Sequence, residues 1–183
     1  DYFRQVGCHV DTLRSGFAPA RFREFKPQLV VLSPGPGRPD DFHMRDTLDE
    51  LTRLGVPVFG VCLGLQGMVE YCGGQLERLP APVHGKASEV VLCQDSPLFQ
   101  GLPQCISVGR YHSWIAAPGR VPGELTALAH TREGQLMALA HRTLPWTAVQ
   151  FHPESILSAE HQQGLHLIRN VVQSARVATP RNN

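Results

Sequence analysis

The stretch that decides the fold is Val58-Phe59-Gly60-Val61-Cys62-Leu63-Gly64-Leu65-Gln66. The apolar run over 56–61 shows no polar alternation, which is typical of a strand buried on both faces of a parallel sheet. A helical pattern follows over 63–72, with Cys62 at the junction. Glycines two residues before and after Cys62 leave room for the sharp turn of a G-x-S-x-G motif, with cysteine in place of serine. The sequence therefore predicts a nucleophile at a strand-to-helix turn, with a buried structural cysteine as the alternative.

Outward from this turn, short apolar runs alternate with longer amphipathic runs, which predicts an α/β domain around a largely parallel sheet. Between residues 75 and 151 the chain reads mostly as strands, with a hairpin turn at Arg132-Glu133-Gly134. Strands this close together leave no room for helical crossovers, so part of the sheet is expected to be antiparallel. Elsewhere we expect strands over 8–14, 29–32 and 146–151, and helices over 1–6, from Asp40 or Asp41 to 54, and over 158–175.

Composition narrows the class of protein. The 183 residues carry 17 Lys and Arg against 16 Asp and Glu, a net charge of +1, with 42% hydrophobic and 18% charged residues. This excludes a disordered chain and gives no electrostatic reason to expect nucleic acid or a membrane. No apolar run approaches the roughly 20 residues of a membrane span. The five cysteines lack metal-site spacing, and their odd number favours a reduced, cytoplasmic protein. We expect one domain over 1–175 and a flexible tail over 176–183.

A candidate base for Cys62 lies in Phe151-His152-Pro153-Glu154-Ser155. His152 follows the expected strand over 146–151, and α/β proteins place their sites at the carboxyl ends of such strands. The helix N-terminus favours thiolate at Cys62, and an imidazole can protonate a leaving group near neutral pH. Glu154 can reach back to orient that imidazole. These residues predict a triad of Cys62, His152 and Glu154, with an ordinary surface histidine as the alternative for His152.

An oxyanion site is expected from backbone N–H groups, since attack on an amide places negative charge on its oxygen. One donor is the N–H of Leu63, directly after Cys62. The other is the rigid loop Ser33-Pro34-Gly35-Pro36-Gly37, whose glycines allow close backbone approach and whose prolines restrict its shape. The loop lacks the pattern of a P-loop or of G-x-G-x-x-G. A plain structural turn is the alternative.

Three separated motifs carry a resemblance to a known family: Ser33-Pro34-Gly35-Pro36-Gly37, Gly60-Val61-Cys62-Leu63-Gly64-Leu65-Gln66 and Phe151-His152-Pro153-Glu154-Ser155. In this order they resemble the class I, triad-type glutamine amidotransferases, over nearly the whole chain. His84-Gly85-Lys86 and Gly109-Arg110-Tyr111-His112-Ser113 are similar to the amidotransferase component of anthranilate synthase and its aminodeoxychorismate synthase relatives. The residues around Gly109 and the opening Tyr2-Phe3-Arg4-Gln5 are most similar to the form of this component that is fused to the chorismate-using synthase.

The resemblance implies a flavodoxin-like, three-layer fold, with a mostly parallel central sheet and an antiparallel extension. Members of the family begin with an apolar strand in the middle of this sheet, and a turn and a helix follow. In this chain only the residues from Asp1 to Val6 correspond to that helix. The first strand is therefore expected to be missing, and the amidotransferase domain over 1–175 to be truncated at its N-terminus.

The resemblance also implies an activity, the hydrolysis of L-glutamine through a cysteine thioester. The ammonia would pass to a chorismate-using synthase, present as a fused domain or as a separate subunit. Anthranilate formation in tryptophan biosynthesis is the first expectation, and an aminodeoxychorismate (folate) or phenazine-type synthase is the alternative. No cofactor or metal is expected in this domain, whereas the partner synthase is expected to use Mg²⁺.

The family pattern assigns a role to each matching residue. Cys62 would be the nucleophile, His152 the acid and base, and Glu154 its orienting partner. The oxyanion and the glutamine substrate would be held by Gly35, Pro36, Gly37, Leu63, Gln66 and the main chain of Ser113 and Trp114. Trp114 stands where the family pattern has an aliphatic residue.

Two other functions stay open at this point. A γ-glutamyl peptidase or a cysteine-type α/β-hydrolase would share the architecture, but an α/β-hydrolase places its acid before the histidine, whereas Glu154 follows His152. A non-catalytic docking subunit would not need a complete triad. Lys86 and Arg110 are expected at the surface, in salt bridges.

Overall fold

Among the residues that the structure describes, seven strands form one mixed sheet in the order β1-β2-β7-β6-β5-β3-β4. The computed structural model describes residues 1–16, 20–93, 95–158 and 162–178. The strands are β1 (Val30–Leu32), β2 (Val58–Val61), β3 (Leu76–Leu92), β4 (Cys105–Ala116), β5 (Leu125–Thr131), β6 (Leu136–His141) and β7 (Trp146–Val149). The α-helices are α1 (Tyr2–Gln5), α2 (Ala20–Phe25), α3 (Met44–Leu54), α4 (Leu63–Tyr71) and α5 (Gln163–Ala178), and the 3₁₀ helices are η1 (Pro39–Phe42), η2 (Pro97–Phe99) and η3 (Ile156–Ser158).

The sheet is parallel at one end and antiparallel at the other. Strand β2 pairs in parallel with both β1 and β7, whereas β6, β5, β3 and β4 are added in antiparallel pairs. Strands β5 and β6 are the arms of the hairpin expected at Arg132-Glu133-Gly134, where Gly134 adopts a φ of +84°. The expected α/β class and antiparallel extension are therefore confirmed, but the described sheet is mixed and not mostly parallel, since two of its strand pairings are parallel and four are antiparallel.

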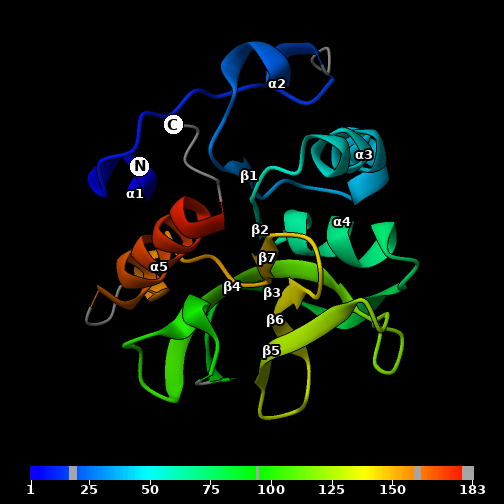
Figure 1. The fold of residues 1–183 in the computed structure, drawn as a ribbon. Helices are drawn as coiled ribbons and strands as arrows, with labels where there is room; N and C mark the ends of the chain where they lie inside the picture. The colour runs from blue at the N-terminus through cyan, green and yellow to red at the C-terminus, as the bar shows by residue number, and fades with distance from the viewer. Residues whose placement is uncertain (17–19, 94, 159–161, 179–183) are drawn as a thin grey trace.

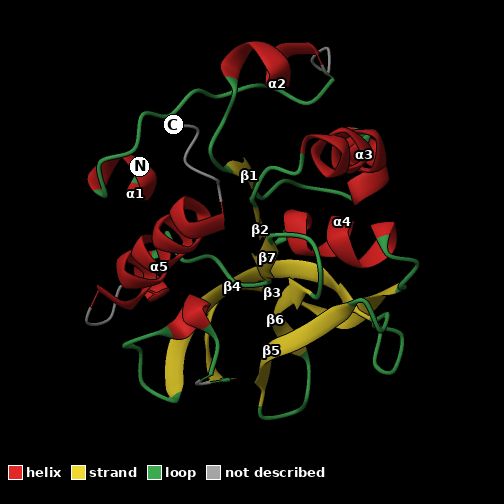
Figure 2. Ribbon diagram, in the orientation of Figure 1, coloured by secondary structure: helices red, strands yellow, loops and turns green. Residues whose placement is uncertain are grey.

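Helices cover both faces of the sheet and give three layers. Figures 1 and 2 show α3 and α4 on one side of the sheet and α5 on the other. Successive side chains of β2 point to opposite faces of the sheet, as the pleat of a strand requires, and so pack in the two cores in turn. Val58 packs in the core beneath α3 and α4, and Phe59 and Val61 pack in the core beneath α5. Among the described residues, none of the helices combines the length and apolar character that a membrane crossing requires.

The strand expected over 8–14 is not formed, and this prediction was wrong. The segment has no regular structure, and the side chains of Cys8, Val10 and Leu13 are only partly buried. In the described part of the chain, no strand pairs with the outer edge of β1. Without a neighbour to accept its backbone hydrogen bonds, an alternating pattern alone does not hold a segment in a strand.

The helix expected to start at Asp40 or Asp41 starts later, at Met44. Both aspartates lie inside the short helix η1, because the side chain of Asp41 accepts a 2.7 Å hydrogen bond from the backbone N–H of Arg38 and closes a tight turn there. His43, with a φ of 50°, then separates η1 from α3. Gly55 ends α3 in the left-handed conformation, as expected.

The last helix is also displaced from its expected bounds. Ser158 belongs to η3, and α5 begins only at Gln163. The helix continues to Ala178, so residues 176–178 are helical and do not form a tail. Residues 179–183 of the expected tail lie outside the described residues.

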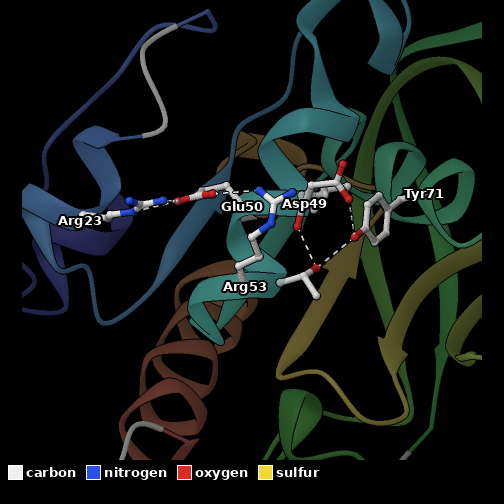
Figure 3. Close-up of polar contacts among 7 residues, drawn as sticks. Arg23, Asp49, Glu50, Arg53 and Tyr71 are labelled. Atoms are coloured by element: carbon white, nitrogen blue, oxygen red, sulfur yellow. Dashed lines mark hydrogen bonds and ion pairs between the residues drawn. The ribbon is translucent and has the colours of Figure 1, made fainter.

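A cluster of polar side chains ties α2, α3 and α4 together (Figure 3). The carboxylate of Glu50, which is 4% exposed, accepts hydrogen bonds of 3.1 Å from both Arg23 and Arg53. Burial alone would raise the pKa of Glu50, but the hydrogen bonds from Arg53 and Arg23 outweigh it and lower this pKa below its ordinary 4.5. The Tyr71 hydroxyl donates to Asp49 at 2.9 Å. These contacts fix α4, and with it the turn that holds Cys62.

Candidate active site

Cys62 occupies the turn between β2 and α4. Its φ of 52° and ψ of −95° lie in a region that residues with a side chain rarely adopt. Such a conformation costs on the order of 1–3 kcal/mol. The side chain is 5% exposed, and it lies at the N-terminus of α4, where helix N–H groups have no partner within the helix. The strained turn thus holds a thiol against free backbone donors.

The two glycines of the motif are required by close packing of α4 on the sheet. A Cβ at Gly60 would lie 2.7 Å from the backbone carbon of Gly64 and 3.0 Å from the Cβ of Ala148 on β7. A Cβ at Gly64 would lie 2.8 Å from the carbonyl oxygen of Leu32 on β1. Neither position has room for any other residue without movement of a backbone.

His152 and Glu154 lie in the loop after β7. The Nδ1 atom of His152 is 2.7 Å from Oε1 of Glu154. Three hydrogen bonds hold the loop: the His152 N–H donates to the Gly109 carbonyl at 3.0 Å, the Ser158 hydroxyl donates to the His152 carbonyl at 2.6 Å, and the Gly109 N–H donates to that hydroxyl oxygen at 2.8 Å. The imidazole is therefore fixed by strand β4 as well as by its own loop.

The electrostatics couple His152 to its two neighbours. Burial lowers the pKa of His152, but interactions with the Cys62 sulfur and with the Glu154 carboxylate more than offset burial and raise it to about 9. The pKa of Glu154 falls below its ordinary 4.5, because the bond to His152 outweighs burial. Nε2 of His152 is buried without a hydrogen-bond partner of good geometry among the described residues. An imidazolium between the Cys62 sulfur and the Glu154 carboxylate, with the N–H at Nε2 left to donate, can deliver a proton to a leaving group.

Two residues that sequence reasoning did not assign also shape this loop. The Tyr111 ring packs edge-on against His152, with ring centroids 5.1 Å apart, and its hydroxyl lies 3.0 Å from Oγ of Ser155. Ser158 is 2% exposed and bridges the loop to β4. The motif around Gly109 was the signal for Tyr111, whereas nothing local in the sequence identifies Ser158.

The glycine-proline loop lies beside the cysteine turn. A Cβ at Gly35 would be 3.1 Å from a methyl group of Leu63, so this backbone passes directly over the start of α4. Gly37 has a φ of +82°, and a Cβ there would collide with the carboxylate of Asp41. The structure thus brings Gly35 against the Leu63 side chain, whereas Gly37 packs against Asp41.

The remaining predicted residues lie on α4 and β4. The Nε2 atom of Gln66 donates to the carbonyl of Trp114 at 2.9 Å, and the ring of Trp114 lies under the Arg38 guanidinium at 4.8 Å. The hydroxyl of Ser113 is 3.4 Å from Nε2 of His84. Gln66 and Trp114 therefore meet across 48 positions of sequence.

Arg110 is not a surface residue, and the expectation of a surface salt bridge for it was wrong. It is 6% exposed, and its guanidinium donates to Nε2 of His112 at 3.1 Å and to the side chain of Gln135. Lys86, which faces it on β3, is exposed as expected. In the ranges that the structure describes, no three His, Cys, Asp or Glu side chains are grouped so as to hold a metal ion.

Comparison with known proteins shows what this chain is similar to. The family model described as "Glutamine amidotransferase class-I" matches residues 1–172. An anthranilate synthase of Azospirillum brasilense is 57% identical over 172 residues, which cover 94% of this chain and 23% of that protein. An aminodeoxychorismate synthase of Streptomyces griseus is 50% identical over 144 residues, 77% of this chain and 19% of that protein. The chain thus spans only about a fifth of the length of these two relatives.

A shorter relative supports this family, and a solved structure supports the fold. The aminodeoxychorismate/anthranilate synthase component 2 of Bacillus subtilis is 36% identical over 155 residues, 84% of this chain and 77% of that protein. The crystal structure of a candidate GMP synthase subunit from Thermoplasma acidophilum superposes with a TM-score of 0.78 at 23% identity, covering 96% of this chain and 85% of that one. At this identity the superposition establishes the fold alone.

Proposed function

The chain belongs to the class I glutamine amidotransferase family, and we propose that Cys62, His152 and Glu154 are the triad with which it hydrolyses glutamine. The observation that carries the proposal is the pairing of a strained cysteine turn with the 2.7 Å contact between His152 and Glu154. The raised pKa of His152, about 9, supports an imidazolium beside the Cys62 sulfur at neutral pH. A docking subunit without catalysis would have no use for this arrangement.

The reaction proceeds in two steps. The Cys62 sulfur attacks the side-chain amide carbon of glutamine, and the carbonyl oxygen becomes an oxyanion. Nε2 of His152 gives its proton to the amide nitrogen, the C–N bond breaks, and ammonia leaves a γ-glutamyl thioester on Cys62. His152 then takes a proton from water, which attacks the thioester and releases glutamate. Glu154 keeps the imidazole oriented throughout and stabilises its charged form.

Backbone donors stabilise the oxyanion. The N–H of Leu63 is the first of the free N–H groups at the start of α4, and the backbone of Gly35 lies against the Leu63 side chain. We assign the second donor to the loop formed by Gly35, Pro36 and Gly37. Preset donors of this kind need no rearrangement as the charge develops.

Gln66 and the main chain of Ser113 and Trp114 hold the amino-acid end of glutamine. Both N–H groups of the Gln66 amide are used, one by the Trp114 carbonyl and one by the side chain of Gln150. Its Oε1 atom has no hydrogen-bond donor within the described part of the chain. This oxygen is therefore the group left to accept a hydrogen bond from the α-ammonium of the substrate.

The ammonia passes to a chorismate-using synthase, as a fused domain or as a separate subunit. The 57% identity with an anthranilate synthase favours anthranilate, and hence tryptophan biosynthesis, as the product route. An aminodeoxychorismate synthase is the second candidate, supported by a relative 50% identical over 144 residues. The glutaminase chemistry itself needs no cofactor, and Mg²⁺ belongs to the synthase. All five cysteines are free thiols, which supports a reducing, cytoplasmic location.

Replacement of the nucleophile tests the triad. In the presence of the synthase, Cys62→Ala is expected to reduce glutamine-dependent product formation by at least about 10³-fold, while product formation from ammonium salts continues. The matched control is Cys72→Ala, at the other end of the same helix, which should keep glutamine-dependent activity. If Cys62→Ala keeps that activity, the assignment of the nucleophile fails. Identification of the aminated chorismate product decides between the two synthases.

A further inference from the structure

Gln150 is a buried polar residue that the mechanism above does not use. It lies between β7 and His152, its side chain is 0% exposed, and its backbone N–H donates to the carbonyl of Met137 on β6 at 2.8 Å. The side-chain Nε2 atom lies 3.5 Å from Sγ of Cys62 with the geometry of a donor. A fully buried amide is thus aimed at the atom that attacks the substrate.

The neighbours of Gln150 determine which end of its amide faces the sulfur. The carbonyl of Trp114 can only accept, so the Gln66 atom that lies 2.9 Å from it must be Nε2. The second N–H on this nitrogen points to Gln150, 3.3 Å away, where it requires an acceptor, Oε1. Nε2 of Gln150 is consequently left to donate to Cys62.

A second donor approaches the same carbonyl from another side. Nδ1 of His112 lies 3.1 Å from the Trp114 carbonyl, and Arg110 donates to Nε2 of His112. Since a guanidinium has no acceptor, Nε2 must be unprotonated and Nδ1 must carry the hydrogen. Burial, together with the nearby Arg110 charge, lowers the pKa of His112 to about 4, so this ring stays neutral. His112 and Gln66 therefore both donate to the Trp114 carbonyl, and the Gln66 amide donates its second hydrogen bond to Gln150, which donates to Cys62.

We propose that Gln150 is a positioning residue that donates a hydrogen bond to Sγ of Cys62, fixes the direction of the sulfur and stabilises its thiolate form. The proposal rests on Cys62 being the nucleophile. A buried anion needs hydrogen-bond donors, and a bond to a charged acceptor is about twice as strong as a bond to a neutral one. The amide of Gln150 therefore favours thiolate over thiol, and it does so through a residue that never touches the substrate.

The test is the pH dependence of Cys62 alkylation in the full protein. Iodoacetamide is the probe, and mass spectrometry of the tryptic peptide over 54–78 follows the product, since fragmentation separates Cys62 from Cys72. Gln150→Met keeps the approximate side-chain volume and removes the N–H donor. Gln150→Asn keeps an amide, but its shorter side chain moves the N–H away from Sγ of Cys62. In both variants the midpoint pH of alkylation should rise by about one unit. The kcat for glutamine at neutral pH should fall about tenfold and recover at higher pH, with KM changed less than twofold.

Asn170→Leu is the matched control. Asn170 is also a buried amide, 7% exposed, but it donates to the carbonyls of Leu98 and Gln100 and makes no contact with the candidate triad. This variant should lose stability and keep the alkylation profile of the wild type. An unchanged midpoint in both Gln150 variants overturns the proposal, as does a raised KM with an unchanged kcat. If alkylated Cys62 still hydrolyses glutamine, the proposed nucleophile itself is wrong, which is a separate result.

Discussion

Replacing Gly64 with alanine adds one methyl group where α4 meets β1. The new Cβ would lie 2.8 Å from the carbonyl oxygen of Leu32 and 2.9 Å from its Cβ. Both atoms belong to a strand that is paired with β2, so they cannot move aside without shifting the sheet. The helix must therefore lift at its first turn, where Leu63 and Cys62 lie.

The expected magnitude follows from two opposing effects. Overpacking of a well-packed contact costs about 1–3 kcal/mol, whereas alanine stabilises a helix by about 1 kcal/mol over glycine. The free energy of unfolding should thus fall by up to about 2 kcal/mol, which lowers Tm by up to about 8 °C in a chain of this size. Displacement of the Cys62 sulfur and the Leu63 N–H should lower the kcat for glutamine about tenfold, because catalysis depends on their geometry.

Thermal unfolding followed by circular dichroism and a glutaminase assay measure the two effects. The matched control is Gly67→Ala, one turn further along α4. Its Cβ would meet Cγ of the buried Met44 at 2.5 Å, so stability should fall here as well, but the overlap is with α3 and not with the strand beside Cys62, so kcat should stay near the wild type. A Gly64→Ala variant as stable and as active as the wild type would refute the explanation of this glycine by close packing.

Three further predictions concern charges and rings. Because the pKa of His152 is raised from 6.5 to about 9, its contribution to stability is fully present below pH 6.5 and is lost as the pH rises through 9. The free energies of unfolding of the wild type and of His152→Asn, measured with urea, should therefore converge over this interval. The pKa of Glu50 is lowered below 4.5, so Glu50→Gln should be less stable at neutral pH, and the difference should shrink as the pH falls below 4.5 in the same measurement. Tyr111→Ala removes the ring packed on His152 and should lower kcat by up to about tenfold, whereas Tyr111→Phe keeps the ring and should act like the wild type; equal kcat values for the two variants would exclude a role for the ring.

The parts of the fold that the sequence predicts are those with local signals. Short stretches of sequence predict the strand over 56–61, the turn at the glycines around Cys62 and the hairpin at Arg132-Glu133-Gly134. The structure contains each of these elements. The segment over 8–14 alternates like a strand, yet whether it pairs depends on a neighbour that its own pattern does not contain. Local pattern therefore predicts which elements can form, but not whether a partner is present.

The hydrogen-bonded support of the site was hidden for a similar reason. Gln150 stands in an apolar run and carries no chemical motif, and its partners Gln66 and Cys62 are 84 and 88 positions away. Arg110 reads as a surface charge, but its acceptors lie on its own strand at His112 and 25 positions away at Gln135. Contacts of this range are created by the packing of strands, so only the folded chain reveals them.

At Cys62, the backbone conformation that the proposed activity requires lowers the stability of the fold. Its φ of 52° is a conformation that glycine adopts without strain, whereas residues with a side chain are strained in it. Selection for a more stable fold alone would therefore remove the cysteine, and under the proposed function it is selection for the chemistry of the thiol that keeps it there. A copy of this domain released from the need to hydrolyse glutamine should accordingly drift first at position 62, with the sheet and helices around it left intact.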